Sequence, residues 1–127
     1  MAETLYHEAR GEPYEGKAAV ATVVVNRVKT PVTYWENTVC GVVYQRGQFV
    51  WTEKYPRDVP HAHHEHDAWR RAILRSTMFV VADRFGIGFA PEGAEDSTFF
   101  SRGGFRNPKL KPDVVIGNHR FFSLSTI

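Results

Sequence analysis

Two glutamates four residues apart, Glu8 and Glu12, are the first side chains in this sequence that could carry chemistry. His7 and Glu8 match the start of the zinc-binding pattern H-E-x-x-H, in which a second histidine one helical turn later faces the same metal ion. Gly11 occupies that position. The zinc-protease interpretation therefore fails, and Glu8 needs another explanation.

The local pattern around Glu8 indicates a carboxyl group with a raised pKa. Apolar residues recur at helical spacing, and Gly11 followed by Pro13 is typical of a helix end, which predicts a short helix over residues 2–10. In its last turn the helix dipole disfavours a further negative charge. A carboxyl group protonated near neutral pH can act as a general acid, as glycosidases require. An exposed glutamate without a catalytic role remains the alternative.

Three further helices are predicted. The first begins with Pro13 in its first turn and runs to about Val28, although its β-branched run Thr22–Val25 could also form a strand. Asn37 is predicted to cap the second helix, a short one with an apolar face of Val39, Val42 and Val43. The third runs from about His64 to Ala82, with an apolar face of Ala68, Trp69, Ala72, Ile73, Phe79 and Val80.

The C-terminal part changes to a strand pattern. "STFF" and "VVIGNHRFFSL" alternate like strands, and Gly117-Asn118 is a good tight-turn pair. The sequence therefore predicts one α+β domain over residues 1–127. It is mainly helical, with a small antiparallel sheet formed largely by the C-terminal strands.

Composition narrows the class of protein. A chain of 127 residues is most simply one domain with a real core, and Cys40, the single cysteine, excludes an internal disulfide. No run of eighteen apolar residues is present, so we expect no membrane span. The sequence also shows no signal peptide, which predicts a protein that stays inside the cell or leaves by another route.

Several segments together resemble one family. "YHEARGEPYEGKAAVATVVVNRV" is similar to the opening of the SleB-type cell wall hydrolases, the spore-cortex-lytic enzyme family that includes CwlJ-like proteins. "TVCGVVYQRGQF" (Thr38–Phe49) and "IGNHRFF" (Ile116–Phe122) match in the same order, and "STFFSRGG" stands where that family has an aromatic strand. The resemblance spans nearly the whole chain. It implies a lysozyme-like fold, the catalytic domain alone, acting on peptidoglycan glycan strands.

The resemblance also implies site residues. The family's catalytic glutamate corresponds to Glu8, whereas Glu12 is expected to be a structural partner near Arg10 or Arg27. Residues expected to contact the glycan are Gln48, Phe49, Trp51, Phe100, Asn118 and His119. Trp51 is included because aromatic faces pack on sugar rings, while the spacing of Trp69 indicates the core. The extra Arg46 and the lack of a tryptophan in "GGFRNPKLKPD" depart from the family and leave the contacts on that side open.

The number of carboxylates bears on the reaction. A two-carboxylate glycosidase needs a second acidic residue across the sugar, and the segment after Phe49 offers only Glu53 and Asp58. A lytic transglycosylase needs one glutamate, which protonates the bridging oxygen and then helps the 6-hydroxyl close a 1,6-anhydro ring. We therefore favour a transglycosylase acting on the MurNAc–GlcNAc bond. A hydrolase, or an inactive peptidoglycan-binding module, is the alternative.

Two other clusters have simpler explanations. The histidines of His61–His66 could bind zinc or nickel, but a solvated loop before a helix explains them, so no metal site and no cofactor is predicted. The basic stretch from Arg102 to Arg120 could meet nucleic acid, an anionic cell wall or only solvent. Its aromatic residues Phe105, Phe121 and Phe122 fit sheet and core, so nucleic-acid binding is not expected.

Setting and pH dependence complete the expectations. A wall enzyme without a signal peptide needs help to reach its substrate, which favours a phage-encoded protein, an endolysin released by lysis or carried on the virion. Release in a sporulating cell is the alternative, and a monomer is expected. Activity should peak at acidic-to-neutral pH, with loss of the Glu8 proton setting the alkaline limb. Titration of His119 could mimic that limb.

Overall fold

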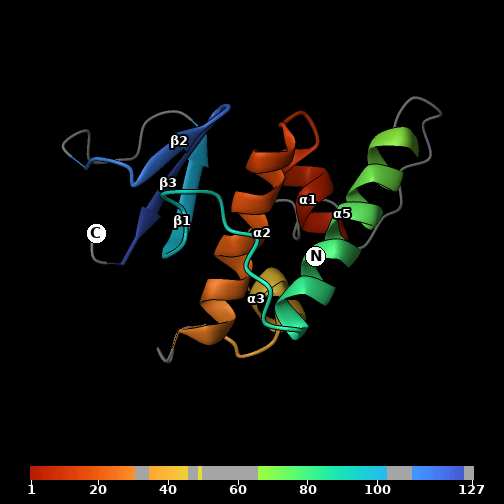
Figure 1. Ribbon diagram of the computed structural model, residues 1–127, viewed down its shortest axis with the longest axis horizontal. Coiled ribbons are helices and arrows are strands. Elements are labelled where there is room, and N and C mark those ends of the chain that lie inside the picture. Colours follow the sequence, from red (N-terminus) through yellow and green to blue (C-terminus); the bar gives the residue numbers. More distant parts are fainter. Residues whose placement is uncertain (31–34, 46–48, 50–65, 103–109, 125–127) are drawn as a thin grey trace.

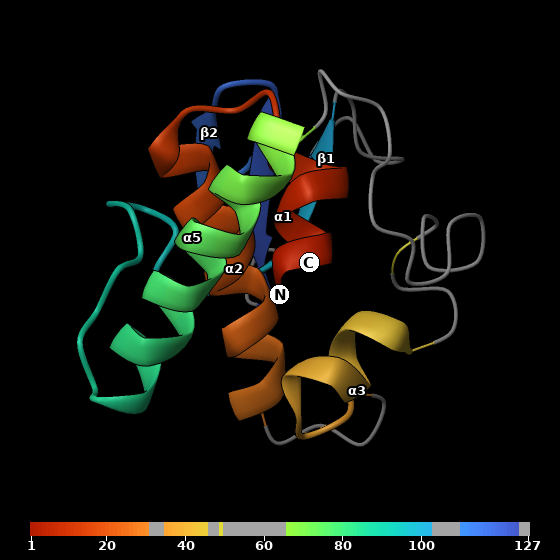
Figure 2. The same ribbon diagram turned by 90° about the vertical axis from the view of Figure 1, so that its right-hand side faces the viewer.

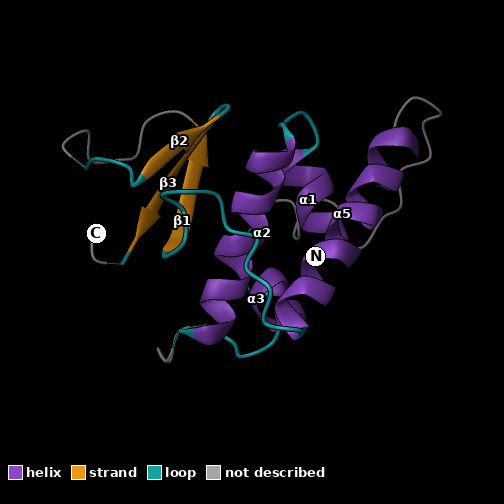
Figure 3. Cartoon of the chain, in the orientation of Figure 1, coloured by secondary structure: helices purple, strands orange, loops and turns teal. Residues whose placement is uncertain are grey.

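The computed structural model describes residues 1–30, 35–45, 49, 66–102 and 110–124. Its elements in chain order are α1 (Ala2–Ala9), α2 (Tyr14–Lys29), α3 (Val39–Tyr44), α5 (His66–Arg84), β1 (Ser97–Arg102), β2 (Val114–Ile116) and β3 (His119–Ser123). Helix α2 lies at the centre, with the sheet on one side and α1 and α5 on the other (Figures 1 and 3). The predicted α+β class, mainly helical with a small antiparallel C-terminal sheet, is confirmed.

Helix α2 is buried along most of its length. Its alanines and valines lie against α1, α3, α5 and β1, so that Ala19, Val20, Val23 and Val24 are fully buried. A helix that is apolar nearly all round belongs in the core of a domain. The β-branched run is therefore helical, and the Thr22 hydroxyl donates to the Ala18 carbonyl at 2.7 Å within the helix. The helical interpretation of this segment is confirmed.

Helix α3 begins one residue later than predicted. Thr38, not Asn37, is its N-cap, and the Thr38 hydroxyl accepts a hydrogen bond from the Gly41 amide at 3.0 Å. Both residue types cap helices well, so the sequence alone could not choose between neighbours. Val42 and Val43 are buried as expected, and with Val24 and Phe49 they form a small second core cluster.

The cap assignment gives a direct stability prediction. Thr38→Ala removes the hydroxyl acceptor, and we expect it to lower the free energy of unfolding by about 1 kcal/mol. Asn37→Ala, one residue earlier, should change that free energy by less than about 0.5 kcal/mol. Urea unfolding followed by circular dichroism measures both. A larger loss for Asn37→Ala than for Thr38→Ala would contradict the cap seen here.

Helix α5 buries a narrower stripe than predicted. Ala72, Ser76 and Phe79 face the core, whereas Ile73 and Val80 are each 43% exposed. The predicted stripe included these two because they also recur at helical spacing, but they lie one position away from the stripe that meets α1 and α2. Figure 2 shows α5 on the outside of the molecule, beside α1. No described helix is long and apolar enough to cross a membrane.

In the sheet, β3 is the central strand, with β1 on one side and β2 on the other. The strand order is β1-β3-β2 and both pairings are antiparallel, as predicted. Gly117 takes a φ of +58° in the two-residue turn between β2 and β3, a backbone conformation that suits glycine. Across the β1–β3 ladder, Phe100 pairs with Phe121 and Arg102 pairs with His119. Directly paired residues share one face of a sheet, which brings Arg102 and His119 together.

Candidate active site

Glu8 lies in the last turn of α1, where the sequence pattern predicts it. Its side chain is half-buried. Burial raises the pKa of this carboxyl, whereas the nearby charges of Arg102 and Arg27 act in the opposite direction. Glu8 therefore holds its proton more tightly than a free glutamate does. The positive charges of Arg102 and Arg27 stabilise its ionised form.

Arg27 is a buried cation held between α2 and the sheet. Its side chain is 5% exposed, and its Nε donates to the Thr98 carbonyl at 2.7 Å. The guanidinium carbon lies 5.5, 5.4 and 5.4 Å from the ring centroids of Trp35, Phe49 and Phe99, respectively. The negative face of an aromatic ring attracts a cation placed over it, so these three rings stabilise the Arg27 charge. This fixed position keeps a positive charge near Glu8.

Asn26 attaches the same end of α2 to the sheet. Its Nδ2 donates to the carbonyls of Glu95 and Ser97, each at 2.9 Å. Together with Arg27, it joins α2 to the start of β1. The hydrogen bonds of the "VNRV" segment therefore connect α2 to β1. They fix the position of β1 relative to the helices, which include α1 with Glu8.

Glu12 is buried, and its partners differ from those predicted. The two carboxylate oxygens accept a hydrogen bond from the backbone N–H of Asn118, at 3.2 and 3.3 Å. A Cβ added to Gly117 would lie 1.8 Å from Glu12 Oε2, so the turn fits this carboxylate closely. Arg10 instead donates to the Tyr6 hydroxyl at 2.9 Å. Because Glu12 follows the end of α1, its side chain points to the β2–β3 turn and not along the helix.

His119 lies below the surface. It is 0% exposed, and its Nδ1 stands 3.3 Å from Glu12 Oε1. On the other side of the ring, Arg102 Nε donates to His119 Nε2 at 3.4 Å, and Arg102 Nη2 donates to the Glu8 carbonyl at 3.0 Å. Burial lowers the His119 pKa, so the ring is neutral near pH 7. The ring does not reach the surface here, and the expected contact of His119 with substrate stays a prediction.

The other predicted glycan contacts fall into three groups. Phe49 is 3% exposed, and its ring packs against Arg27 and Phe100. It therefore lies in the core beside the site and not on its surface. Phe100 is half-buried and Asn118 is exposed, so both present surface beside the site. Gln48 and Trp51 lie outside the described residues, as do Glu53 and Asp58.

Sequence reasoning missed two charged residues of this site. The sequence pattern indicates Arg102 only as part of a basic stretch, and Arg27 only as a candidate partner of Glu12. Arg102 follows Phe100 at a spacing of two on a predicted strand, which places both on one face of the sheet. That alternation was the available signal for Arg102.

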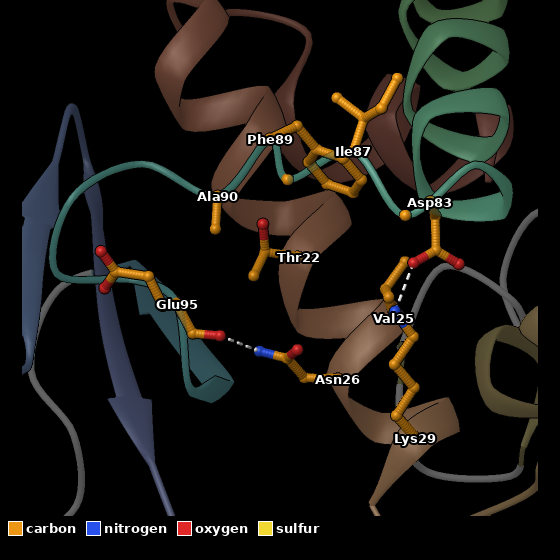
Figure 4. Close-up of a pocket in the computed structure, with 11 residues that line it drawn as sticks. Thr22, Val25, Asn26, Lys29, Asp83, Ile87, Phe89, Ala90 and Glu95 are labelled. Carbon is orange, nitrogen blue, oxygen red and sulfur yellow. Dashed lines mark hydrogen bonds and ion pairs between the residues drawn. The ribbon is translucent and has the colours of Figure 1, made fainter.

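A separate hollow lies between α2 and the loop that follows α5 (Figure 4). It has a volume of about 180 Å³, and the Lys29–Asp83 ion pair stands at its edge. Its other polar lining includes Asn26, whose amide is held by the Glu95 carbonyl. None of Glu8, Arg102 and His119 lines it. Within the described ranges, which exclude residues 50–65, no group of three or more His, Cys, Asp or Glu side chains could hold a metal ion.

Comparison with known families decides the classification. The family described as Cell Wall Hydrolase matches residues 11–122 of this chain. The chain belongs to the cell wall hydrolase family. Among the relatives of this cell wall hydrolase are the spore cortex-lytic enzymes of Bacillus subtilis strain 168 and Oceanobacillus iheyensis. Each is 47% identical, over 45 and 49 residues, or 35% and 39% of this chain. These matches span only 14% and 17% of the relatives' own lengths.

Solved structures extend the likeness to almost the whole cell wall hydrolase chain. The catalytic domain of the Bacillus cereus SleB protein aligns with a TM-score of 0.63 at 27% identity, covering 97% of this chain and 86% of that one. The catalytic domain of the germination-specific lytic transglycosylase SleB from Bacillus anthracis aligns with a TM-score of 0.61 at 28% identity, covering 97% and 90%. The SleB-type resemblance to a catalytic domain and the lysozyme-like fold are thereby confirmed.

Proposed function

We propose that this cell wall hydrolase domain cleaves the MurNAc–GlcNAc bond of peptidoglycan as a lytic transglycosylase, with Glu8 as its general acid and base. The position of Glu8 carries the proposal: a half-buried carboxyl in the last turn of α1, with a raised pKa and two arginines close by. The alignment with a catalytic domain named as a lytic transglycosylase supports the reaction type. The family match begins at residue 11, so the role of Glu8 is argued from its geometry.

The environment of Glu8 suits both halves of the reaction. Burial favours the protonated acid, which donates its proton to the bridging oxygen as the glycosidic bond breaks. The resulting carboxylate is stabilised by the charges of Arg102 and Arg27. It then takes the proton of the sugar's 6-hydroxyl while that oxygen bonds to the anomeric carbon. The ring closes to a 1,6-anhydro sugar, Glu8 is again protonated, and no water is consumed.

The hydrogen bonds of Glu12 favour a mechanism with one catalytic carboxylate over a mechanism with two. Glu12 is the nearest acidic residue to Glu8 in the sequence, but its oxygens are occupied by the Asn118 amide and its side chain is buried. It is therefore not available to act on the opposite face of a sugar. A mechanism that needs only Glu8 fits this arrangement.

Product analysis tests the reaction directly. Purified peptidoglycan treated with the protein should release muropeptides with 1,6-anhydro-MurNAc ends, and mass spectrometry identifies them because they are one water lighter than hydrolytic products. Reducing-end products would show a hydrolase instead. Intact wall that retains the protein, beside an active control enzyme, would show a binding module without catalysis and would reject the proposal.

The named relatives favour a spore setting. Both are spore cortex-lytic enzymes, so spore cortex peptidoglycan is the proposed substrate, and the expected phage or endolysin origin has no support. Digesting isolated cortex and vegetative sacculi in parallel tests this choice. A markedly faster release of muropeptides from cortex is expected, and a preference for vegetative wall would contradict it.

A further inference from the structure

We propose that Glu12 and His119 are positioning residues that act through Arg102, holding its guanidinium against Glu8 for the reaction proposed above. This inference rests on the proposed function and adds to it a residue, Arg102, and the pair that fixes it. Four residues from α1, the α1–α2 linker, β1 and β3 form the row Glu12, His119, Arg102, Glu8.

The direction of the hydrogen bonds follows from the donors. Arg102 carries only N–H groups, so it donates to His119 Nε2, which must then be the unprotonated ring nitrogen. The ring proton of the neutral histidine is therefore on Nδ1, 3.3 Å from Glu12 Oε1. That contact is electrostatic and not a well-aligned hydrogen bond, and Nδ1 has no other hydrogen-bond partner among the described residues. The negative charge of Glu12 thus selects the tautomer that can accept from Arg102.

Burial makes the first two members of the row rigid. His119 is 0% exposed and Glu12 is 6% exposed, and the Glu12 carboxylate is held by the β2–β3 turn. Arg102, in contrast, is exposed at the end of β1. An exposed arginine loses side-chain entropy when it is fixed in one rotamer. Its two contacts, with His119 Nε2 and with the Glu8 carbonyl, hold the guanidinium in place.

The consequence concerns the proton on Glu8. The charges that face its carboxyl are Arg102 from β1 and Arg27 from α2, and both lower its pKa against the effect of burial. The groups that face His119 are Glu12 and Arg102, and Lys17 donates to the Glu12 backbone carbonyl. Burial already outweighs these two charges, and loss of the fixed Arg102 charge should remove part of the opposition to it, so the Glu8 proton would be retained to higher pH.

Two amide substitutions at position 119 separate the two ring nitrogens. His119→Asn places its amide near Nδ1 and removes the acceptor for Arg102, whereas His119→Gln places its amide near Nε2 and can still accept. We expect the alkaline limb of peptidoglycan turnover to move to higher pH in Arg102→Met and, less far, in His119→Asn. His119→Asn should also lower kcat roughly 10-fold with little change in KM, because the guanidinium is displaced and substrate contacts are not. His119→Gln should restore most of both properties.

A double-mutant cycle shows whether His119 acts through Arg102. In the Arg102→Met background, His119→Asn should move the limb no further. Arg120→Met, an exposed neighbour of His119 on β3, is the matched charge control and should leave the limb unchanged. A limb that stays at the wild-type pH in both Arg102→Met and His119→Asn overturns the inference, as does a further shift in the double variant. Arg102→Met keeps the test available if a substitution at buried His119 prevents folding.

A measurement without substrate distinguishes this inference from the proposed function. A ¹³C NMR titration of the Glu8 carboxyl should show a higher pKa in Arg102→Met and His119→Asn than in the wild type. If the wild type yields no product but Glu8 titrates in this way, the proposed function fails and the positioning row stands. If turnover depends on Glu8 but its titration is the same in all variants, the positioning row fails and the function stands.

Discussion

Glu8→Gln is expected to lower peptidoglycan turnover by at least about 100-fold, because a positioned general acid contributes about 10²–10⁴-fold and glutamine keeps its shape without its proton. Release of soluble muropeptides measures the loss. Glu92→Gln, at an exposed glutamate in the loop before β1, is the matched control and should keep wild-type turnover. A Glu8→Gln protein with more than about a tenth of wild-type turnover would exclude Glu8 as the essential acid.

The same substitution should stabilise the fold at neutral pH. Burial raises the Glu8 pKa above its ordinary value of 4.5, so the folded state binds this proton more tightly than the unfolded chain does. Stability from that proton is fully present below the unfolded pKa and is lost as pH rises through the folded pKa. Glutamine is neutral throughout. The variant should therefore unfold at higher urea than the wild type at pH 7, and the difference should shrink toward zero near pH 4.

That pairing of lost activity with gained stability identifies a site residue. A glutamate with a purely structural role would lose stability on substitution, because a favourable contact would be removed. Equal stability gains at pH 4 and pH 7 would mean that the gain does not come from the carboxyl charge. Urea midpoints at the two pH values, with Glu92→Gln alongside, decide between these explanations.

The helices were predictable because their signals are local. The last turn of α1, the start of α2 and the position of Glu8 all follow from spacing and from Gly11 and Pro13. The errors arose where two neighbours satisfied the same rule. Asn37 and Thr38 are both good caps, and the residues of α5 fit two adjacent apolar stripes, so only packing against α1 and α2 could choose between them.

The partners of Glu12 could not be read from the sequence. The Asn118 amide lies 106 positions away along the chain, and nothing local specifies that contact. The resemblance marked both ends of it, in "ARGEPYEG" and "IGNHRFF", as motif segments without saying that they touch. The same limit applies to His119, because polar residues in a short strand are usually expected at the surface. In β3, His119 and Phe121 lie on one face of the strand and Phe122 on the other, and all three are buried.

Gly117→Ala should be the most damaging substitution in the turn that meets Glu12. Alanine at a φ of +58° costs about 1–2 kcal/mol in backbone strain. Its Cβ would also stand 1.8 Å from Glu12 Oε2, so the carboxylate must move and its hydrogen bond from Asn118 is lost, at a further cost of about 1.5–3 kcal/mol. We expect a loss of about 2.5–5 kcal/mol in the free energy of unfolding, measured in urea.

Gly86→Ala separates the two contributions to that loss. Gly86 has a φ of +71°, but an added Cβ would meet nothing within 4 Å, so this variant should lose only the strain of about 1–2 kcal/mol. Glu12→Ala in the Gly117→Ala background should then cost much less than Glu12→Ala alone, because the carboxylate has already been displaced. Equal losses in Gly117→Ala and Gly86→Ala would show that Glu12 adds no stability at the turn. In that case the turn would not hold the Glu12 carboxylate rigidly beside His119. The row from Glu12 through His119 and Arg102 to Glu8 would then have no fixed residue at its start.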